Sequence, residues 1–371
     1  MPDQSSAAAQ PAGKAARLQS LDLLRGFTIA AMILVNTPGD GDHVYHPLTH
    51  AEWNGCTPTD VIFPGFIFMA GVSIVFALGK KRQSPGMLLK ALRRMLTLIA
   101  IGWGINLVYH FDPAHLRFPG VLQRIALVYF IATFLFLKLE ARQLRLVSWG
   151  LLAGYYLLFW LPFPGKGVDL FDPQHNIVAY VDHTLFGAGH LYQWAYTDPC
   201  GLLSTLPAIA TALLGIEAGN ILKQTSDPTA KTAQLLRTGL LLTAGGLLAD
   251  FIFPINKPLW SSAYVLYTGG ICMSCLGISF WYFDVRQYGR RFWPLLVFGT
   301  NAIFAYVVAE VLPKFVNMIV IGHARGLHIV YAALAAVCAP ELASVLAAMA
   351  FVGLVWMMML LLYKRGIIIK V

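Results

Sequence analysis

Long apolar stretches, separated by short polar segments, run along most of the 371-residue chain. Each stretch can form an α-helix that crosses a bilayer, which takes about 20 residues. A transmembrane β-barrel would instead show short segments of alternating polarity. The pattern predicts an all-α, polytopic membrane bundle of about ten transmembrane helices, at roughly residues 20–38, 58–79, 92–109, 119–137, 146–162, 201–222, 235–253, 259–283, 294–320 and 341–363.

Composition and charge agree with a membrane protein. Hydrophobic residues make up 57% of the chain and charged residues 12%, whereas soluble domains carry about 25% charged residues. With the N-terminus placed in the cytoplasm, 21 of the 27 Lys and Arg residues fall in cytoplasmic loops and helix ends, and six on the opposite side. This excess predicts that both termini are cytoplasmic. Because the positive charges form no single patch, the net charge of +9 does not indicate nucleic-acid binding.

The first 17 residues, rich in Ala, Ser and Gln, predict a disordered cytoplasmic tail. They are not a cleaved signal peptide, because they contain no apolar core. Residues 18–371 are predicted to form a single transmembrane domain. Two segments, 39–57 and 163–200, are placed on the extracytoplasmic side, and the second is long enough to cover another part of the molecule. Residues 326–341 are too few to cross easily and predict a helix at the outer surface.

The chain has five cysteines. Cys272 and Cys275 are one helical turn apart in an apolar stretch without His or acidic neighbours, which favours a packing role over a metal or redox site. We predict no bound metal. Cys56 and Cys200 both lie in extracytoplasmic segments, and the sequence leaves a disulfide between them open.

Ionisable residues within the predicted spans are candidates for function, because each costs about 2.5–3.5 kcal/mol at the bilayer centre on insertion scales. Structural explanations remain open for several of them. Arg25 can pair with Asp22, and Glu310 with Lys314 one turn away. Arg124 needs an anionic partner, which is either a group of the chain or a phosphate of a ligand. The ionisable residues in question are Arg25, Asp60, Arg124, Glu217, Asp250 and Glu310.

The densest polar group lies at the outer ends of the first two spans. Thr57 is a suitable N-cap, Pro58 the first helical residue and Asp60 the third, which is the arrangement of a capping box. A carboxylate at this position can also bind His50 in the preceding loop, fix its tautomer and leave its other nitrogen free as a base. The predicted polar corner consists of Asn36, His50, Trp53, Asn54 and Asp60.

Aromatic, amide and carboxylate side chains in the outer segments suit a sugar. A Trp ring can stack on the sugar, and the polar groups can bind its hydroxyls. The segments 163–200 and 254–261 add such residues to the polar corner. The predicted substrate-binding residues are Trp53, Asn54, Asp198, Asn256, Lys257 and Trp260.

Seven stretches, in order along the chain, resemble the heparan-α-glucosaminide N-acetyltransferase family. They are LDLLRGFTIAAMILVN, HAEWNG, TDVIFPGFIFMAG, PGVLQRIALVYF, DPCGLLSTLPAIATALLGIEAG, PINKPLWSSAYVLYTGG and WPLLVFGTNAIFAY. The resemblance implies a bacterial-type member in the inner (cytoplasmic) membrane, without the luminal domain of the lysosomal enzyme. It also implies transfer of an acetyl group from cytoplasmic acetyl-CoA to the amine of glucosamine or a terminal glucosaminide on the extracytoplasmic side.

The resemblance assigns the family's essential histidine to His50, and its motif Asp and Asn to Asp60 and Asn36. One departure is Ala309, where the lysosomal enzyme has a histidine directly before the residue that matches Glu310. We expect His50, with Asp60, to act as the base, and Asn36 to donate a hydrogen bond to the carbonyl oxygen. Direct transfer is favoured over an acetyl-histidine intermediate, because substrates that enter from opposite faces can meet without a covalent relay.

The phosphates of acetyl-CoA need cationic or amide donors. The predicted cofactor-binding residues are Arg25, Gln123, Arg124 and Asn301. The alternative function is an amino-sugar transporter or permease without acyl transfer, and a third is a structural or accessory membrane protein. The sequence leaves open the exact acceptor, the acyl-chain preference and whether the protein is a homodimer.

Overall fold

The computed structural model describes residues 18–79, 82, 84–109, 111–112, 115–192, 196–224, 227–321 and 324–369. The predicted tail, residues 1–17, lies outside the described residues. Within them the secondary structure is helical apart from one hairpin, β1 (Val320–Ile321) and β2 (Ala324–Arg325), and an isolated bridge. The α-helices are α1 (Gln19–Asn36), α2 (Ile62–Leu78), α3 (Met87–Tyr109), α4 (Val121–Lys138), α5 (Ala141–Leu158), α6 (Ile177–Phe186), α7 (Thr205–Gln224), α8 (Pro228–Ala249), α9 (Ser262–Ser279), α10 (Trp293–Thr300), α11 (Ala302–Val316), α12 (Leu327–Ala335) and α13 (Pro340–Lys364). Shorter helical turns are η1 (His46–Leu48), η2 (Pro58–Val61), η4 (Ala188–His190), η6 (Phe280–Val285) and η7 (Tyr288–Phe292).

The chain is an all-α, polytopic membrane protein. Six of the described helices are long and apolar enough to cross a membrane, or seven if the bent pair α10–α11 counts as one span. Helices α1, α5 and α8 coincide with predicted spans but fall outside this set, because polar and charged residues within them lower their mean hydropathy. The total of about ten spans therefore stays a prediction.

The predicted span 294–320 is not one continuous helix. Helices α10 and α11 are bent by 84° at a break around Asn301. The Asn301 side chain donates to the Ile367 carbonyl at 3.0 Å and accepts the Ile369 N–H at 2.8 Å. These hydrogen bonds join the break to the segment that follows α13. The buried Asn301 side chain thus provides partners for backbone groups that are outside a regular helix.

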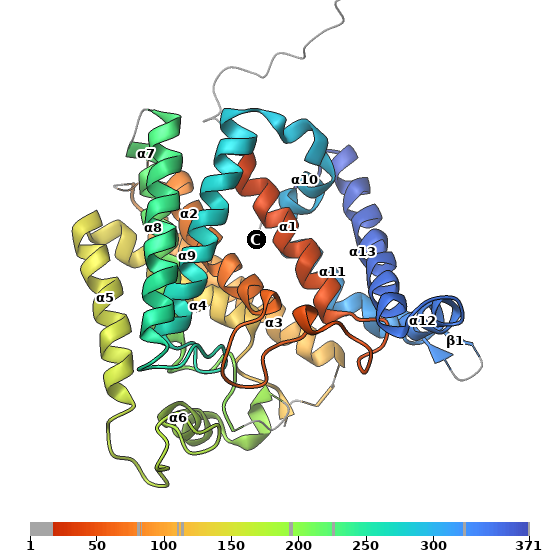
Figure 1. Cartoon of the computed structure of the whole chain (residues 1–371), viewed down its shortest axis with the longest axis horizontal. Helices are drawn as coiled ribbons and strands as arrows, with labels where there is room; N and C mark the ends of the chain where they lie inside the picture. The colour runs from red at the N-terminus through yellow and green to blue at the C-terminus, as the bar shows by residue number, and fades with distance from the viewer. Residues whose placement is uncertain are drawn as a thin grey trace, which may run out of the picture.

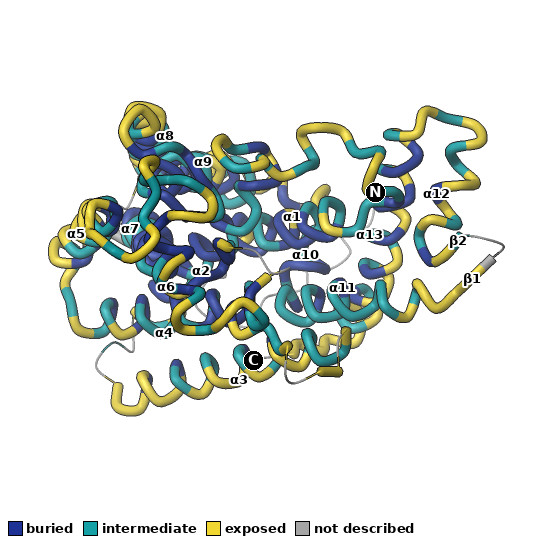
Figure 2. The backbone as a smooth tube through the Cα atoms, turned by 90° about the horizontal axis from the view of Figure 1, so that it is seen from below, coloured by how far each residue is buried: buried dark blue, intermediate teal, exposed yellow. Residues whose placement is uncertain are grey.

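Helices α2, α7 and α9 form the centre of the bundle, and α3, α5 and α8 lie at its exposed margins (Figure 2). Of the candidate spans, α7 is the most buried, at 78% of its apolar window. Gly71 of α2 packs directly on Gly215 of α7, and a Cβ at either position would collide with the backbone of the other helix. Close packing through small residues is the usual way in which helices associate in a membrane.

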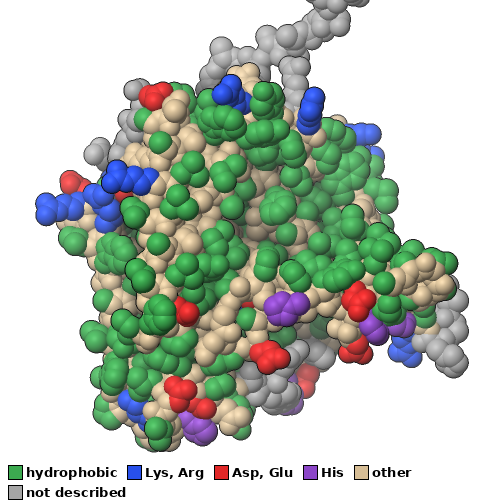
Figure 3. Space-filling model, in the orientation of Figure 1, with side chains coloured by type: hydrophobic (Ala, Val, Ile, Leu, Met, Phe, Trp, Pro, Cys, Tyr) green, Lys and Arg blue, Asp and Glu red, His purple; other side chains and the backbone are tan. Residues whose placement is uncertain are grey.

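Helices α1 and α9 diverge from the top of the view to the bottom, where the loop between α1 and α2 crosses in front of the bundle (Figure 1). On this face hydrophobic side chains cover the middle, and Asp, Glu and His gather toward the lower end (Figure 3). The segment 163–200, predicted as a covering loop, contains the helix α6 at that lower end. A short helix, α12, is present within the predicted surface segment 326–341.

Candidate active site

The loop between α1 and α2 leads into η2, where Thr57, Pro58 and Asp60 start the helix. The Thr57 N–H donates to Asp60 Oδ2 at 3.1 Å; the Thr57 hydroxyl, which donates to the Thr49 carbonyl at 2.7 Å, lies 3.1 Å from the same carboxylate oxygen. This confirms the predicted capping box with Asp in place of Glu. It fixes the Asp60 carboxylate at the outer end of the helix with an exposed fraction of 0%.

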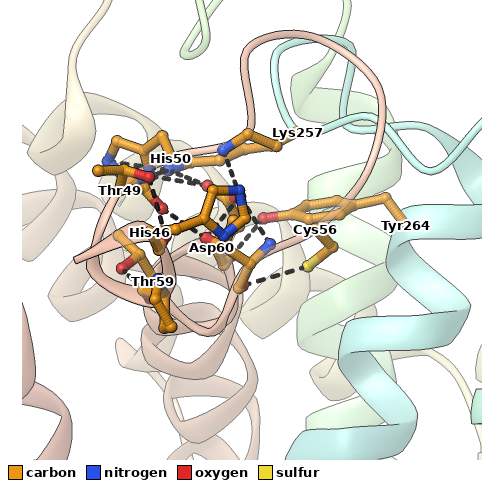
Figure 4. Close-up of polar contacts among 11 residues, drawn as sticks. His46, Thr49, His50, Cys56, Thr59, Asp60, Lys257 and Tyr264 are labelled. Carbon is orange, nitrogen blue, oxygen red and sulfur yellow. Dashed lines mark hydrogen bonds and ion pairs between the residues drawn. The ribbon is translucent and has the colours of Figure 1, made fainter.

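The Asp60 carboxylate joins three segments of the chain (Figure 4). Its Oδ2 also accepts the Ala51 N–H at 3.0 Å. Its Oδ1 accepts hydrogen bonds from His50 Nδ1 at 2.7 Å and from Lys257 Nζ at 3.1 Å. Together with the Thr57 N–H, these donors compensate the loss of water around a buried charge.

His50 is the exposed member of this group, with 52% of its side chain exposed. The contact with Asp60 places the ring proton on Nδ1, which leaves the lone pair on Nε2. A neutral imidazole held in this way can take a proton through Nε2 from a bound substrate. The structure therefore brings together His50 and Asp60, as the spacing in the sequence predicts.

Lys257, in the loop between α8 and α9, lies against both residues. Its Nζ is 2.9 Å from Nδ1 and 3.4 Å from Nε2 of His50. Because the Nδ1 proton points at Asp60, the ammonium donates to Asp60 and places its charge beside the imidazole ring. Burial lowers the pKa of Lys257, and the Asp60 carboxylate opposes that shift. Lys257 is therefore the cation that compensates the buried Asp60 carboxylate.

The substitution Lys257→Met is expected to lower Tm by several degrees, because the buried Asp60 carboxylate loses its cationic partner. Thermal unfolding of the purified protein measures the change. Lys166→Met removes a charge from another outer loop and should leave Tm in place. An unchanged Tm in Lys257→Met would mean that the hydrogen bonds to Asp60 compensate its charge without the ammonium.

Asn256 holds the loop between α8 and α9 against the loop between α1 and α2. Its Nδ2 donates to the Trp53 carbonyl at 3.0 Å and to Asn54 Oδ1 at 3.1 Å. The Trp53 indole in turn donates to the Phe171 carbonyl at 2.9 Å, which attaches the long outer segment. Asn256 is 0% exposed, so in this structure it positions these loops. Trp53 is half-buried and Asn54 is exposed, so both can be reached from outside.

Two more of the predicted substrate-binding residues are buried among partners from the chain. Trp260 is 0% exposed; its indole donates to Thr211 Oγ1 at 3.2 Å, and the Arg124 guanidinium lies 5.0 Å from its ring centre. Asp198 is also 0% exposed and accepts hydrogen bonds from Arg117 at 3.0 and 2.7 Å. Neither side chain can contact a sugar in this structure.

Three of the four predicted cofactor-binding residues are buried: Gln123 at 6%, Arg124 at 1% and Asn301 at 2% exposed. Arg124 donates to the Gly201 carbonyl at 2.9 Å and to the Ser204 hydroxyl. Asn301 holds the break between α10 and α11, as described above. Arg124 and Asn301 therefore have structural roles that need no ligand, whereas these contacts assign no such role to Gln123.

The fourth, Arg25, is the most accessible, with 26% of its side chain exposed. Its predicted ion pair with Asp22 is confirmed at 3.2 Å, and it also donates to the Ser73 hydroxyl of α2. The ion pair therefore accounts for the arginine without excluding a ligand at its exposed edge.

Asn36 makes its contacts in a different place from the His50–Asp60 pair. The Asn36 amide and the Tyr306 hydroxyl are hydrogen-bonded to the Glu310 side chain of α11. The pair of Glu310 with Lys314 that the sequence left open is not formed, because the Lys314 ammonium donates to the Val108 carbonyl. Glu310 is thus held by neutral groups, and Asn36, which is exposed, connects it to the outer surface.

Asp182 of α6 is buried where the long outer segment packs on the start of α7. One carboxylate oxygen accepts the Leu202 N–H at 2.9 Å, and the other has no partner among the described residues. Burial is the main cause that raises the pKa of Asp182 to about 7, and the Asp198 carboxylate adds to it.

We expect Asp182→Asn to raise Tm by a few degrees at about pH 8 and to change it little at about pH 4. Between about pH 4 and 7 the folded state holds a proton that the unfolded chain has lost, so the wild type loses stability as pH rises through this window. Asparagine keeps the acceptor for Leu202 and removes the charge. Asp42→Asn, at an exposed position, is the control. Equal shifts at both pH values would contradict this account.

All five cysteines are free thiols, so no disulfide joins Cys56 to Cys200. Among the described residues, no cluster of three or more His, Cys, Asp or Glu side chains is arranged to hold a metal ion. Cys56, Cys272 and Cys275 line one cavity between the helices. Cys272 packs against the apolar core, whereas Cys275 is exposed, so the packing role predicted for the pair stays a prediction for Cys275.

Comparison of the sequence with known proteins identifies the family of this chain. A family model described as "Heparan-alpha-glucosaminide N-acetyltransferase, catalytic" matches residues 17–246. The chain is 32% identical to the heparan-α-glucosaminide N-acetyltransferases of Mus musculus and Homo sapiens, over 361 and 362 residues respectively. These alignments cover 81% of this chain but 54% of the mouse and 53% of the human protein, so the chain spans about half the length of these curated relatives. The chain belongs to the heparan-α-glucosaminide N-acetyltransferase family.

Proposed function

We propose that this protein transfers the acetyl group of acetyl-CoA to the amine of glucosamine, or of a terminal glucosaminide, on the extracytoplasmic side of a membrane. The observation that carries the proposal is the half-exposed His50, whose Nδ1 lies 2.7 Å from the buried carboxylate of Asp60. Membership of an acetyltransferase family supports the same chemistry. The predicted location in a bacterial inner membrane would put this site in the periplasm.

The proposed reaction is a direct transfer. The amine nitrogen attacks the thioester carbon, and His50 Nε2 takes the proton that the amine loses. The C–N bond forms and the C–S bond breaks; the departing thiolate takes the proton from the imidazolium and leaves as the thiol of CoA. Asp60 holds the ring and stabilises the transient imidazolium, and the charge of Lys257 favours return of the proton. An acetyl-histidine route remains the alternative.

Acetyl-CoA is the proposed donor and enters from the cytoplasmic side. Of the predicted cofactor-binding residues, Arg25 is the best placed to meet a phosphate, because it is partly exposed near the start of α1. Trp53 and Asn54 are the proposed acceptor contacts, since they are accessible and belong to the loop that carries His50. For the predicted oxyanion role, the Asn36 amide would have to donate a hydrogen bond to the thioester carbonyl oxygen of acetyl-CoA while it stays hydrogen-bonded to Glu310.

A transporter is the second candidate, because the α10–α11 break is of the kind that lines substrate sites in transporters. The test uses purified protein with acetyl-CoA and glucosamine. We expect N-acetylglucosamine and free CoA thiol in equal amounts. Reconstitution in liposomes covers the second candidate: glucosamine uptake in the absence of acetyl-CoA, without acetylated product, would replace the transferase proposal with a permease.

A further inference from the structure

A cavity of about 410 Å³ lies between α1, α2 and α9 and ends at η2. We call it the lateral groove; its walls include Phe27, Thr28, Gly65, Phe68, Tyr267 and Cys272. It lies where α1 and α9 diverge (Figure 1). Phe27, on its rim, is 60% exposed, although nothing in the mechanism proposed above uses this surface. An exposed aromatic rim within a membrane segment opens toward lipid.

The groove has little to offer a polar ligand. The Thr28 hydroxyl donates to the Leu24 carbonyl at 2.7 Å, and the Thr57 hydroxyl donates to the Thr49 carbonyl at 2.7 Å. Both hydroxyls therefore already have partners in the chain. Apart from the Tyr267 hydroxyl, the walls offer the amides of a pantetheine arm few groups to replace their bonds to water, and this loss is costly. A hydrocarbon chain has no such requirement and gains free energy for each buried methylene.

The inner end of the groove is closed between α1 and α9. The first backbone N–H groups of α1, those of Gln19 and Ser20, donate to the Asp284 carboxylate at 3.0 and 3.1 Å. Asp284 belongs to η6, which continues from α9. This cap joins the two helices on the side predicted to be cytoplasmic, so the groove is entered from the bilayer or from the outer side.

The outer end of the groove is part of the candidate active site. Cys56, Thr57 and Pro58 line it, and the Thr57 N–H binds the same Asp60 carboxylate that holds His50. A chain that fills the groove therefore places whatever is attached to its outer end beside His50.

We propose that the lateral groove binds the hydrocarbon chain of a membrane lipid whose polar end carries the amine acceptor. This inference rests on the proposed function and narrows its substrate class to a lipid-linked amino sugar. The apolar walls, the capped inner end and the shared Thr57 each favour this occupant over the arm of the acyl donor. The chain anchors the acceptor, and the transfer step at His50 is unchanged.

The test compares the methyl, butyl and octyl β-glycosides of glucosamine as acceptors for protein in phosphatidylcholine nanodiscs. We expect kcat/KM to rise with chain length, to at least about tenfold between methyl and octyl. Gly65→Leu should bring the octyl value down to the methyl value. A Cβ at Gly65 would meet Cys272 Sγ at 3.8 Å and the Thr28 methyl at 3.9 Å, which are ordinary contacts, so the side chain can enter the groove.

Gly104→Leu on α3 is the matched control, because a Cβ there has no neighbour within 4 Å, and it should keep the chain-length dependence. The glycosides partition into the nanodisc lipid to the same extent for the wild type, Gly65→Leu and Gly104→Leu. A difference in chain-length dependence between these three proteins therefore comes from the groove. Equal kcat/KM for all three glycosides, with transfer intact, would overturn the groove inference and leave the proposed function standing. A higher KM for acetyl-CoA in Gly65→Leu would assign the groove to the donor instead.

Calorimetric binding of the octyl and methyl glycosides without acetyl-CoA separates the two proposals. Tighter binding of the octyl glycoside, lost in Gly65→Leu, supports the groove even if no acetyl transfer occurs, in which case the proposed function fails alone. Octyl glucoside, which lacks the amine, tests for an adventitious detergent site. If its chain alone gives the same affinity and it does not compete with the octyl glucosaminide, the groove is not the acceptor site.

Discussion

Replacing His50 with alanine is expected to lower kcat for acetyl transfer by about 10³-fold. The imidazole is the exposed group of the site, and its hydrogen-bonding contacts are with Asp60 and Lys257. The alanine variant lacks the base but keeps the hydrogen bond from Lys257 to Asp60, which is 3.1 Å long. We therefore expect Tm and the affinity for CoA to change little. The measurement is release of CoA thiol in the presence of glucosamine.

The control is His46→Ala. His46 is exposed and lies four residues earlier in the same loop, in η1, so it reports any general effect of removing an imidazole from this surface. A rate within severalfold of wild type for His50→Ala would exclude it as the base. Incubation of wild-type protein with acetyl-labelled CoA and no acceptor then separates the two routes: label retained on the protein would indicate the acetyl-histidine intermediate, and none would favour direct transfer.

The central pair of the site could be predicted because its determinants are local. His50 and Asp60 are ten residues apart, and the Thr57–Pro58 signal fixes where the helix begins and so where the carboxylate lies. The position of Lys257 beside them could not be derived in the same way. It comes from a loop about two hundred residues later, and its place depends on Asn256 pairing with the loop that carries Trp53.

The misleading signals came from residues whose side chains have two common uses. A Trp in an outer loop can stack on a sugar or fill a core, and Trp260 does the second because Arg124 and Thr211 surround it. Likewise, hydropathy reports that α10 and α11 are apolar but not that they meet at 84°. The only local trace of that bend is the run Gly299–Thr300–Asn301, whose residues are poor helix formers.

Asp60→Asn should reduce kcat by about 10³-fold, as much as removal of His50, although it changes one atom. In the serine protease triad the corresponding exchange leaves the histidine in the wrong tautomer. Here the amide has a forced orientation. Oδ2 of Asp60 faces the N–H groups of Ala51 and Thr57, so an NH₂ group at that position would meet two donors. At the Oδ1 position the donors are the His50 ring, which can move its proton to the other nitrogen, and the Lys257 ammonium on a flexible side chain. The two backbone N–H groups cannot change, so the amide oxygen takes the Oδ2 position and the NH₂ group faces His50.

In that orientation the new NH₂ group donates to Nδ1 of His50, which moves the ring proton to Nε2 and removes the lone pair that the amine needs. Lys257 also loses the carboxylate that compensates its charge, so some loss of Tm is expected. Asp40→Asn is the matched control, because Asp40 forms the other His–Asp pair of this loop, with His43 at 2.6 Å. It should leave the rate unchanged.

The pH dependence distinguishes a fixed tautomer from a weakened base. If Asp60 acted only by making His50 more basic, Asp60→Asn would yield a weaker base that is neutral at lower pH, and its acidic limb would move down with activity partly retained. If Asp60 fixes the tautomer, the loss persists across the neutral and alkaline range, because raising the pH does not return the lone pair to Nε2. We expect the second result, since the two backbone N–H groups at Oδ2 hold the amide oxygen there and leave the NH₂ group facing His50.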